Sequence, residues 1–378
     1  MARVPSYPKT TALVSRALGL PPEALAAGFV AATPAELTQL VALRRQVIGD
    51  ALTWDDARYL GWRYDLGSPG RGGGECWVVK RGDEVLAMLG SERIRVRHQG
   101  RAVDGLSVMD IAVRPEFDGV GLGVWMAMHL CERVDCVLAI GSNANSRALV
   151  TRVFERLPDR RSYAHLFEFG PTLSRRWHSG VRAPVVGALA GWGMALWRGS
   201  VALTRTRSLR IEPLARFDAG IDALVSASRS GAEIAVDRDA HFQNWRLMEN
   251  PRSAYTVWAA REGAELVGWI AVRAKASEDG KQVMVIEDML ARADDRGAAV
   301  LTALLCRCFK QARALGCERI TVIACHPQNE RVLRRLGFFA HRADAETLSV
   351  RCRDDVLNAA IAAGVPWHLT GANTDRDD

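Results

Sequence analysis

Residues 109–130 carry the side chains and the backbone pattern that could do chemistry. An apolar run from Val108 to Val113 indicates a buried strand, which the carboxylate of Asp110 interrupts once. Proline cannot donate a hydrogen bond to a neighbouring strand, so Arg114-Pro115 ends this one. The sequence Asp118-Gly119-Val120-Gly121-Leu122-Gly123 follows, and apolar residues at helical spacing come after it. The order is therefore strand, glycine-rich turn, helix.

The turn predicts an anion site. Glycine lets the backbone approach a ligand closely, and the first N–H groups of a helix have no partner within the helix. The helix dipole adds partial positive charge at the same place, which suits a pyrophosphate. The spacing differs from GxGxxG and from GxxxxGK[ST], and no Lys-Ser/Thr pair follows, so nucleotide triphosphate chemistry is not expected. A plain tight turn is the other interpretation of these glycines.

The pattern Val-x-Pro-x-aromatic-x-Gly-x-Gly-x-Gly resembles the acyl-CoA site of the GNAT superfamily of N-acyltransferases, whose signature is Arg/Gln-x-x-Gly-x-Gly/Ala. Gly121 and Gly123 match the two small positions, and Val113 and Pro115 match the strand end. Asp118 stands where the family has Arg or Gln. A carboxylate there repels a pyrophosphate but leaves the backbone cradle in place.

The second half of the chain repeats this order of elements. Three pairs of segments carry the repeat: Trp62-Arg63 with Trp245-Arg246, Met109-Asp110-Ile111 with Glu287-Asp288-Met289, and Gly121-Leu122-Gly123 with Gly297-Ala298-Ala299. Their offsets fall from 183 to 178 to 176 residues, as expected for a duplicated domain with small deletions. The second half also ends on Asn, a helix and Leu-Gly-Phe, which is similar to the ending of GNAT domains.

The resemblance implies an acyl-CoA, most simply acetyl-CoA, as co-substrate, with the central strand pairing with its pantetheine arm. The binding residues that it implies are Ile111, Ala112, Val113, Asp118, Gly119, Val120, Gly121, Leu122 and Gly123 in the first half, and Arg296, Gly297, Ala298 and Ala299 in the second. The first half keeps more glycines, so we expect it to bind acyl-CoA better, while the second half shapes the acceptor pocket.

Acyl transfer to an amine requires a polarised thioester and a base for the amine proton. Asp110 is the candidate general base, because burial favours the protonated form of a carboxylate, and Asp288 has the same place in the repeat. A structural role, bonded to a loop or an arginine, is the alternative for both. The family's usual general acid is a tyrosine; the matching positions hold Phe154 and Leu333, which cannot donate a proton.

These observations predict an α+β fold of two tandem GNAT-like domains. Each domain is expected to have a mixed, mostly antiparallel, splayed sheet with helices on both faces. The predicted parts are an N-terminal extension (1–25), a first domain (26–175), an apolar linker helix (176–205), a second domain (206–355) and a C-terminal tail (356–378). We expect Trp367 in the tail to dock on the second domain, and 373–378 to be acidic and disordered.

The linker contains fifteen uncharged residues, 183–197, between Arg182 and Arg198. A transmembrane helix needs about twenty apolar residues, so this segment is too short to span a bilayer. A helix packed across the domains is the first interpretation. A peripheral helix at a membrane surface, with Trp192 and Trp197 at the interface, is the second.

Composition narrows the partners. The 378 residues are 48% hydrophobic and 25% charged, with a formal net charge of +7. Positive charge suits an anionic ligand such as CoA, and the basic residues are spread along the chain, so no nucleic-acid partner is expected. The eight cysteines form no CxxC pair, which favours reduced core thiols, no metal site and a cytoplasmic location. The oligomeric state is open.

The expected function is N-acyl transfer from acyl-CoA to a primary amine of a small polar acceptor, such as an amino sugar or an amino acid. The alternative is a catalytically degenerate GNAT-like protein that binds CoA or acts as a scaffold at a membrane surface. The missing tyrosine and the two aspartates at the Arg/Gln position, Asp118 and Asp294, favour the alternative; the retained Gly121 and Gly123 favour the enzyme.

Overall fold

The computed structural model describes residues 7–48, 57–66, 73–141, 146–167, 209–228, 233–277, 279–324 and 326–373. The helices of the first half are α1 (Tyr7–Leu18), α2 (Pro22–Ala27), η1 (Pro34–Glu36), α3 (Leu37–Ile48), α4 (Ala57–Arg63), η2 (Pro115–Phe117), α5 (Leu122–Cys131) and α6 (Arg147–Val153). Its strands are β1 (Phe29–Ala31), β2 (Gly74–Arg81), β3 (Glu84–His98), β4 (Arg101–Val113), β5 (Cys136–Ile140) and β6 (Glu155–Leu166).

The second half follows the same plan. Its helices are α9 (Gly220–Ala227), α10 (Ala240–Gln243), η3 (Asn244–Met248), α11 (Asp295–Ala314), α12 (Pro327–Arg335), α13 (Asp355–Ala362) and η4 (Gly371–Asn373). Its strands are β7 (Arg210–Pro213), β8 (Ile234–Val236), β9 (Thr256–Glu262), β10 (Glu265–Ala276), β11 (Gln282–Ala291), β12 (Arg319–Ala324), β13 (Phe339–Cys352) and β14 (Trp367–His368).

The strands form one sheet, in the order β1-β2-β3-β4-β5-β13-β6-β12-β11-β10-β9-β7, with β8 and β14 beside β3. The neighbours β4 and β5, β11 and β12, and β8 and β14 are parallel, and the other pairs are antiparallel. The predicted mixed, mostly antiparallel fold class with helices is therefore confirmed.

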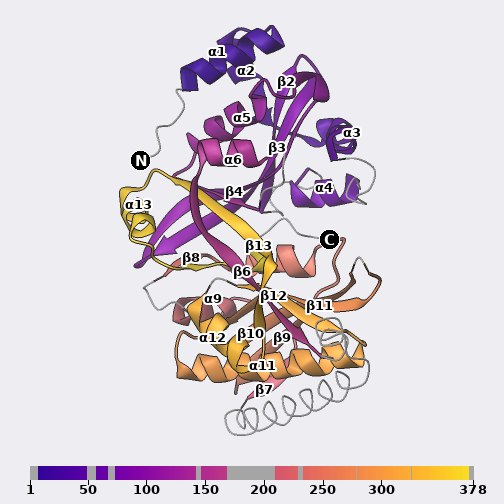
Figure 1. Ribbon diagram of the computed structural model, residues 1–378, viewed down its shortest axis with the longest axis vertical. Coiled ribbons are helices and arrows are strands. Elements are labelled where there is room, and N and C mark those ends of the chain that lie inside the picture. The colour runs from indigo at the N-terminus through magenta and orange to yellow at the C-terminus, as the bar shows by residue number, and fades with distance from the viewer. Residues whose placement is uncertain are drawn as a thin grey trace, which may run out of the picture.

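The two halves exchange their last long strands. β13 of the second half pairs with β5 of the first, with Leu348 opposite Ile140 and Cys352 opposite Cys136. β6 of the first half pairs with β12 of the second, with Arg319 opposite Leu166. Figure 1 shows β13 running up into the first half while β6 runs down into the second. We expected one sheet in each domain, and the exchange joins the two into one.

Helices cover both faces of the sheet in each half. In the first half α1, α2, α5 and α6 share one core with the sheet, and α3 and α4 share another. In the second half α11 and α12 cover one face, and α9 covers the other. Thr33 and Glu36 form a reciprocal capping box at the start of η1, which leads directly into α3.

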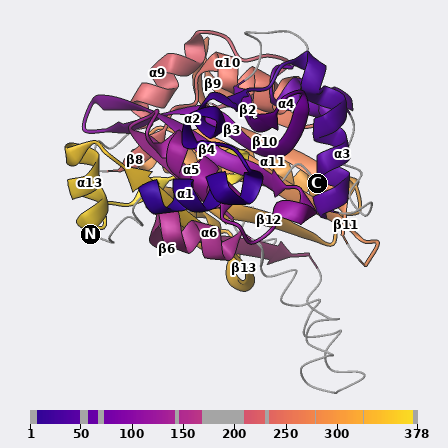
Figure 2. The same cartoon turned by 90° about the horizontal axis from the view of Figure 1, so that it is seen from above.

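The N-terminal segment, which the sequence predicts to be an extension, contains the helices α1 and α2. Val14, Leu18 and Leu25 are at most 3% exposed and belong to the first core. Figure 2 shows α1 lying over α5. The Trp125 Nε1 donates a hydrogen bond to Thr11 Oγ1 at 3.2 Å, which fixes α1 on the outer side of α5.

The C-terminal tail is folded as far as Asn373. Trp367 is buried in a core cluster that contains residues of both halves, and the backbone of β14 pairs with β8 of the second half. The tail therefore docks where the two halves meet, on the second domain as expected and also on the first. Asn373 is 5% exposed, so the predicted disorder does not begin there.

The predicted linker helix at 183–197 lies outside the described residues. Within the described part of the chain, no helix has the length and apolar character to cross a membrane. The seven cysteines in the described part carry free thiols, and five of them are buried.

Candidate functional site

The strand β4 bends at Asp110 and there leaves its parallel neighbour. Met109 pairs with Gly90 and Ala112 with Met88, so two residues, Asp110 and Ile111, face a single residue of β3. This is a β-bulge, and Asp110 has the left-handed φ of 48°. The pairing of β4 with β5 ends at Val108, although β4 continues to Val113. The two strands therefore part where the sequence predicts the site.

Two side chains from the helices below hold the Asp110 carboxylate. Arg44 Nη2 of α3 lies 3.0 Å from Oδ1, and the hydroxyl of Tyr64 donates to Oδ2. Burial, followed by the nearby charge of Asp110, raises the pKa of Tyr64 well above its usual value, so Tyr64 stays a proton donor in this bond. Gly90 is required, because a Cβ there would lie 2.1 Å from the Tyr64 hydroxyl.

This network favours the structural alternative for Asp110. Both oxygens accept hydrogen bonds from protein donors, and the side chain is 14% exposed. A strained residue held by its surroundings can be part of a functional site. Here the left-handed residue lies two positions beyond the end of the pairing between β4 and β5. The general-base role of Asp110 stays a prediction.

The glycine-rich turn leads directly into α5. Gly119 and Gly121 have φ of 74° and 87°, a conformation that favours glycine. Gly121 is the N-cap of α5, and no side chain caps this helix. Asp118 is exposed, and its Oδ1 accepts a hydrogen bond from the N–H of Gly119 at 2.8 Å. The first amides of α5 are thus left without a side-chain acceptor from the cap.

The predicted binding residues of the first half come together around this turn. A Cβ at Gly123 would lie 3.2 Å from Leu149 of α6 and 3.3 Å from Ile111 of β4, so α5 approaches both closely. Ile111, Val113, Val120 and Gly121 are half-buried. By contrast, Ala112 and Leu122 are buried, at 2% and 1% exposure, so they can contribute only backbone atoms.

The equivalent aspartate of the second half is fully enclosed. Asp288 is 1% exposed, and its Oδ2 lies 3.3 Å from Nε of Arg238 and accepts a hydrogen bond from Nε2 of Gln243 at 3.0 Å. A carboxylate that is paired and closed off from water has no route to an amine. The geometry again favours a structural role, and the catalytic role of Asp288 stays a prediction.

The second predicted binding segment lies inside the first turn of α11. Asp294 is the N-cap, and its Oδ1 accepts a hydrogen bond from the N–H of Gly297 at 2.7 Å. A Cβ at Gly297 would lie 1.8 Å from the carbonyl oxygen of Arg292, so this glycine serves a close backbone approach. Arg296 pairs with Glu262, Ala298 is half-buried and Ala299 is 5% exposed.

Several residues around the two sites had no signal in the sequence. Arg44 and Tyr64 lie 66 and 46 positions from Asp110, and nothing local connects them. On α1, Thr10 lies 4.0 Å from the position of a Cβ at Gly121. His129 bonds with Tyr7 of α1 and stacks on Trp125, so it packs α1 on α5. Phe154 and Leu333, the positions of the family's tyrosine, are 7% and 0% exposed.

A cluster of Glu233, His326 and His368 brings three potential metal-ligating atoms within 4.8 Å of one another. The two imidazole rings are stacked, with centroids 4.0 Å apart and planes tilted by 17°. An ion binds in the plane of an imidazole, at about 2.0–2.1 Å from its nitrogen. Two nearly parallel planes do not meet at such a point, so this arrangement is a packing contact. Burial lowers the pKa of His326 to about 4, which keeps the ring neutral.

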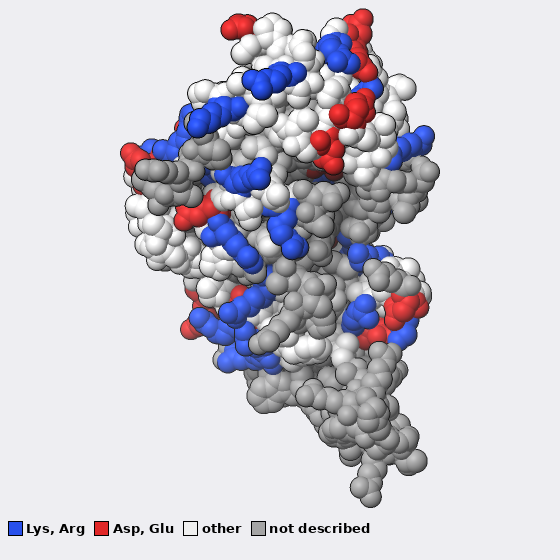
Figure 3. All heavy atoms as spheres, turned by 45° about the horizontal axis from the view of Figure 1, so that its top comes forward, with Lys and Arg blue, Asp and Glu red and all other residues white. Residues whose placement is uncertain are grey.

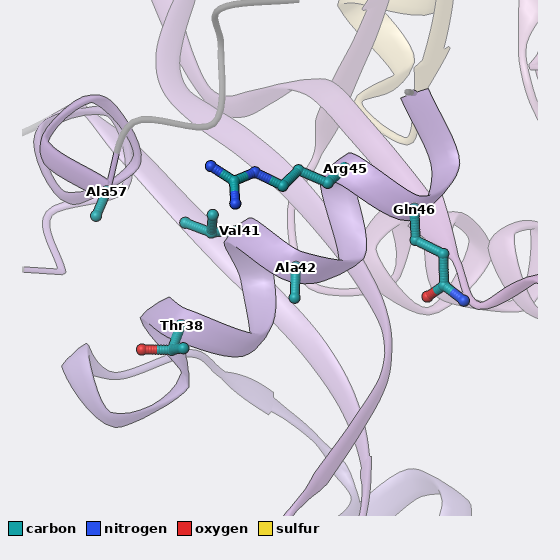
Figure 4. Close-up of a pocket in the computed structure, with 6 residues that line it drawn as sticks. All are labelled: Thr38, Val41, Ala42, Arg45, Gln46 and Ala57. Atoms are coloured by element: carbon teal, nitrogen blue, oxygen red, sulfur yellow. The ribbon is translucent and has the colours of Figure 1, made fainter. Parts of the chain in front are cut away.

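A separate hollow of about 600 Å³ lies on the outer face of α3. Figure 4 shows its lining residues, Thr38, Val41, Ala42, Arg45, Gln46 and Ala57, with Arg45 extending across it. Leu40 and Arg44, on the other face of α3, are buried against the sheet. The hollow therefore opens away from Asp110 and is not part of the site.

Comparisons with known proteins agree with this architecture. Residues 221–338 match the model of the GNAT acetyltransferase family. The crystal structure of a GCN5-related N-acetyltransferase from Anabaena variabilis ATCC 29413 is similar, with a TM-score of 0.58 and 11% identity over 86% of this chain and 72% of that one. One from Kribbella flavida has a TM-score of 0.55 and 15% identity, over 86% and 70%.

A third similar structure is a conserved protein of unknown function, a probable N-acyltransferase, from Enterococcus faecalis V583. Its TM-score is 0.56 at 9% identity, over 86% of this chain and 72% of that one. No curated protein sequence matches the chain. At these identities the solved structures show the fold, and the family model identifies the second half. Residues 221–338 thus match the GNAT acetyltransferase family, and most of the chain shares the fold of these acetyltransferase structures.

Proposed function

We propose that the first half of this chain binds an acyl-CoA, acetyl-CoA in the simplest case, and transfers the acyl group to the primary amine of a small polar acceptor such as an amino sugar or an amino acid. The observation that carries the proposal is the uncapped N-terminus of α5, which follows a glycine turn at the point where β4 and β5 part.

The turn fits a pyrophosphate. A Cβ at Gly119 would meet nothing within 4 Å, so the backbone there faces open space. The ten-residue helix α5 supplies amides without intrahelical partners and the positive end of its dipole. A phosphate placed there gains both, as at other helix N-termini.

The end of β4 fits the acyl arm. Ile111 and Val113 are half-buried, and this stretch of β4 has no pairing with β5. An extended pantetheine arm can hydrogen-bond with a strand edge of this kind, and a backbone N–H at the bulge can polarise the thioester carbonyl. The amine nitrogen then bonds to the carbonyl carbon, the carbon–sulfur bond breaks, and the CoA thiolate leaves with the electron pair.

The protein's part in proton transfer is small in this proposal. Asp110 is the candidate acceptor of the amine proton, through its 14% exposed carboxylate. Phe154 stands where a proton donor is expected, so the thiolate takes its proton from water. The competing function, a degenerate CoA-binding or scaffold protein, is favoured by one observation: both oxygens of Asp110 are already bonded to Arg44 and Tyr64.

The distribution of charge favours a small anionic ligand over a nucleic acid. On the face shown in Figure 3, Lys and Arg side chains are scattered over both halves, and Asp and Glu side chains lie among them. Nucleic-acid binding predicts an affinity that falls steeply with salt. We expect no such affinity for DNA or RNA.

Calorimetric titration with acetyl-CoA tests the proposal. We expect one site per chain, and in Gly121→Glu a loss of affinity of at least about 100-fold, because a carboxylate near 4 Å from a phosphate costs several kcal/mol at the effective dielectric of a protein surface. The matched control is Gly280→Glu. Gly280 also has positive φ, 75°, and open space around a Cβ, but it lies in the turn between β10 and β11.

The same variants decide between the two functions when acyl transfer is measured against a panel of amino sugars and amino acids. An enzyme loses transfer in Gly121→Glu and keeps it in Gly280→Glu. Binding without transfer to any amine indicates a degenerate member. If both variants transfer the acyl group equally well, the first half is not the site of transfer.

A further inference from the structure

In the second half, the parallel strands β11 and β12 also separate, and other residues of the chain lie in the gap between them. β11 and β12 pair in parallel from Val283 to Ile286, and the ladder ends opposite Val322. Glu287 is the extra residue of a bulge, since Asp288 pairs with Ala271 and Ile286 with Val272. The bulge of β4 lies at a nearby position, Asp110 and Ile111.

The last described residues of the chain lie between these two strands. Thr370 forms an antiparallel bridge with Ala324 of β12. Gly371 touches the bulge of β11, because a Cβ there would lie 2.9 Å from the carbonyl oxygen of Glu287. Residues 369–373 are buried, and among them Leu369 is 0% and Asn373 5% exposed. Main chain of the tail therefore fills the gap where β11 and β12 diverge.

The segment is held from several sides. Nη1 of Arg160, in the exchanged strand β6, donates a hydrogen bond to the carbonyl oxygen of Thr370 at 2.5 Å. The Asn373 Oδ1 accepts a hydrogen bond from the N–H of Thr370 at 3.1 Å, which closes the turn η4. Before it, β14 pairs with β8, and His368 stacks on His326 at the start of α12. The tail is thus anchored on β6, β8, β12 and α12.

The other end of the same site is also occupied. The carboxylate of Asp294 accepts the N–H of Gly297 at the start of α11. A carboxylate at a helix N-terminus satisfies the same amides and the same dipole that a phosphate would. In α5 of the first half, no side chain does this.

We infer that the second acyl-CoA site is filled by this chain itself: Asp294 takes the place of a phosphate, and residues 369–373 take the place of the pantetheine arm. The second half then binds no acyl-CoA while the tail is docked, and each chain binds one. The inference rests on the GNAT fold of the second half and on the contacts of the tail, and only the count of one site depends on the function proposed above.

Hydrogen–deuterium exchange with and without acetyl-CoA tests this in the full chain. We expect residues 369–373 and 287–291 to be protected in the free protein, and acetyl-CoA to add protection at 119–125 but not at 287–299. The opening variant combines Asp294→Ala with removal of residues 370–378, which keeps Trp367 and Leu369 in the core. Its control combines Asp294→Ala with removal of residues 374–378 only, so the segment 369–373 remains.

In the opening variant we expect exchange at 287–291 to rise at least about tenfold, as for a region that loses local burial, and a second acetyl-CoA to bind. Gly371→Leu is a milder version, in which the side chain pushes the segment off Glu287. Rapid exchange of 369–373 in the free protein overturns the inference, as does ligand protection of 287–299 in it. Opening without a second binding event overturns it too, because the two groups are then not what excludes the ligand. If the free protein binds no acetyl-CoA but shows the protected tail, the proposed function fails and the docking stands.

Discussion

The end of β4 and the end of β11 hold equivalent places in the two halves, yet they differ in exposure. Asp110, Ile111 and Val113 are half-buried. Their counterparts Asp288, Met289 and Ala291 are 1%, 1% and 5% exposed. Both strands carry a bulge near this aspartate and part from their parallel neighbour, yet the edge is open in one half and filled in the other. The segment 369–373 fills the second edge.

The two helix N-termini differ in the same direction. α5 starts after a glycine with φ of 87° and has no side-chain cap, whereas α11 is capped by Asp294. A capped helix is the more stable one, by about 0.5–2 kcal/mol. The uncapped helix keeps its amides for a ligand. The second half matches the family model, and in this half Asp294 and residues 369–373 occupy the places where a ligand could bind.

The repeated tryptophans have a structural explanation. Trp62 and Trp245 stack on each other with ring centroids 5.0 Å apart, and Trp245 Nε1 donates a hydrogen bond to the Trp62 carbonyl oxygen at 3.3 Å. The neighbouring Arg63 and Arg246 lie 2.9 and 4.0 Å from one carboxylate, Glu92. Equivalent residues thus meet across the junction of the halves, as in a two-fold dimer.

Replacing the two aspartates gives the largest expected contrast in stability. Asp288→Asn leaves Arg238, 3% exposed, without its carboxylate, and we expect a loss of about 3–5 kcal/mol in the free energy of unfolding. Asp110→Asn should cost about half as much, because the side chain at this position is 14% exposed and the ion pair is less completely removed from water. Urea denaturation measures both. Asparagine tolerates the left-handed φ of Asp110, so backbone strain does not confuse the pair.

Acyl transfer is the second measurement that distinguishes the Asp110 and Asp288 variants. Asp110→Asn should lower acyl transfer, while Asp288→Asn should change transfer only as far as it unfolds the chain. Equal losses of stability in the two variants would contradict the view that one strand end is open and the other filled.

The docking of the tail should depend on pH through His326. Burial lowers the pKa of this imidazole to about 4, from 6.5. The unfolded protein binds a proton at this imidazole below pH 6.5, whereas the folded protein does so only near pH 4. The free energy of unfolding is therefore highest above pH 6.5 and decreases as the pH falls toward 4. The full effect is about 3 kcal/mol. The groups that face the ring are His368, Glu233, Arg238 and Arg331.

His326→Gln isolates this effect, since glutamine stays neutral at every pH. Thermal melts of both proteins at intervals between pH 7 and pH 4 give a difference curve, from which the titration of other groups cancels. We expect the wild type to lose stability relative to the variant across this range. A flat difference curve would mean that His326 takes up its proton at the same pH in the folded and the unfolded protein, so that burial does not lower its pKa.

The fold class and the order of strand, glycine turn and helix around the first candidate site could be predicted from the sequence, because both depend on local spacing. The apolar strand, the glycines 119, 121 and 123 and the helical periodicity after them lie within one stretch of chain. The capping box at Thr33 is equally local. The alternation of elements in the two halves then indicated a duplication.

The exchange of β6 and β13 could not be predicted from the sequence. Both strands are the last long strand of their half, and either sheet could accept either strand. The helix α6 stops at Val153, and β6 continues through Pro158, with Leu157 paired with Leu348. The partners of Asp110 could not be predicted from the sequence either, because Arg44 and Tyr64 lie far from it along the chain.

The sequence did contain patterns that indicate two features of the second half. Asp294 precedes a helical pattern, which is typical of an N-cap, but the repeat placed it in a ligand turn. Residues 369–373 carry no charge, between His368 and the acidic end of the chain. An uncharged run of this kind is compatible with burial. The packing of that run against Glu287 and Ala324 requires the folded sheet.

The smallest effect concerns Asp118, the residue that departs from the GNAT signature. Asn in its place keeps the oxygen that accepts the N–H of Gly119 and removes the negative charge. At low salt a charge about 7 Å away in water is worth about 0.6 kcal/mol, so we expect acetyl-CoA to bind two- to threefold more tightly to Asp118→Asn. The gain should shrink at about 0.5 M salt, where charges are screened.

Asp104→Asn makes the same change in net charge at the far end of β4, where the carboxylate is 83% exposed and pairs with Arg95. It should leave the affinity unchanged, because its charge is remote from the turn. If instead Asp118→Asn weakens binding, the charge of the carboxylate matters because it strengthens the hydrogen bond from Gly119 and so holds the turn. The departure from Arg or Gln is then an adaptation of the loop, and the phosphate relies on the amides of α5 alone.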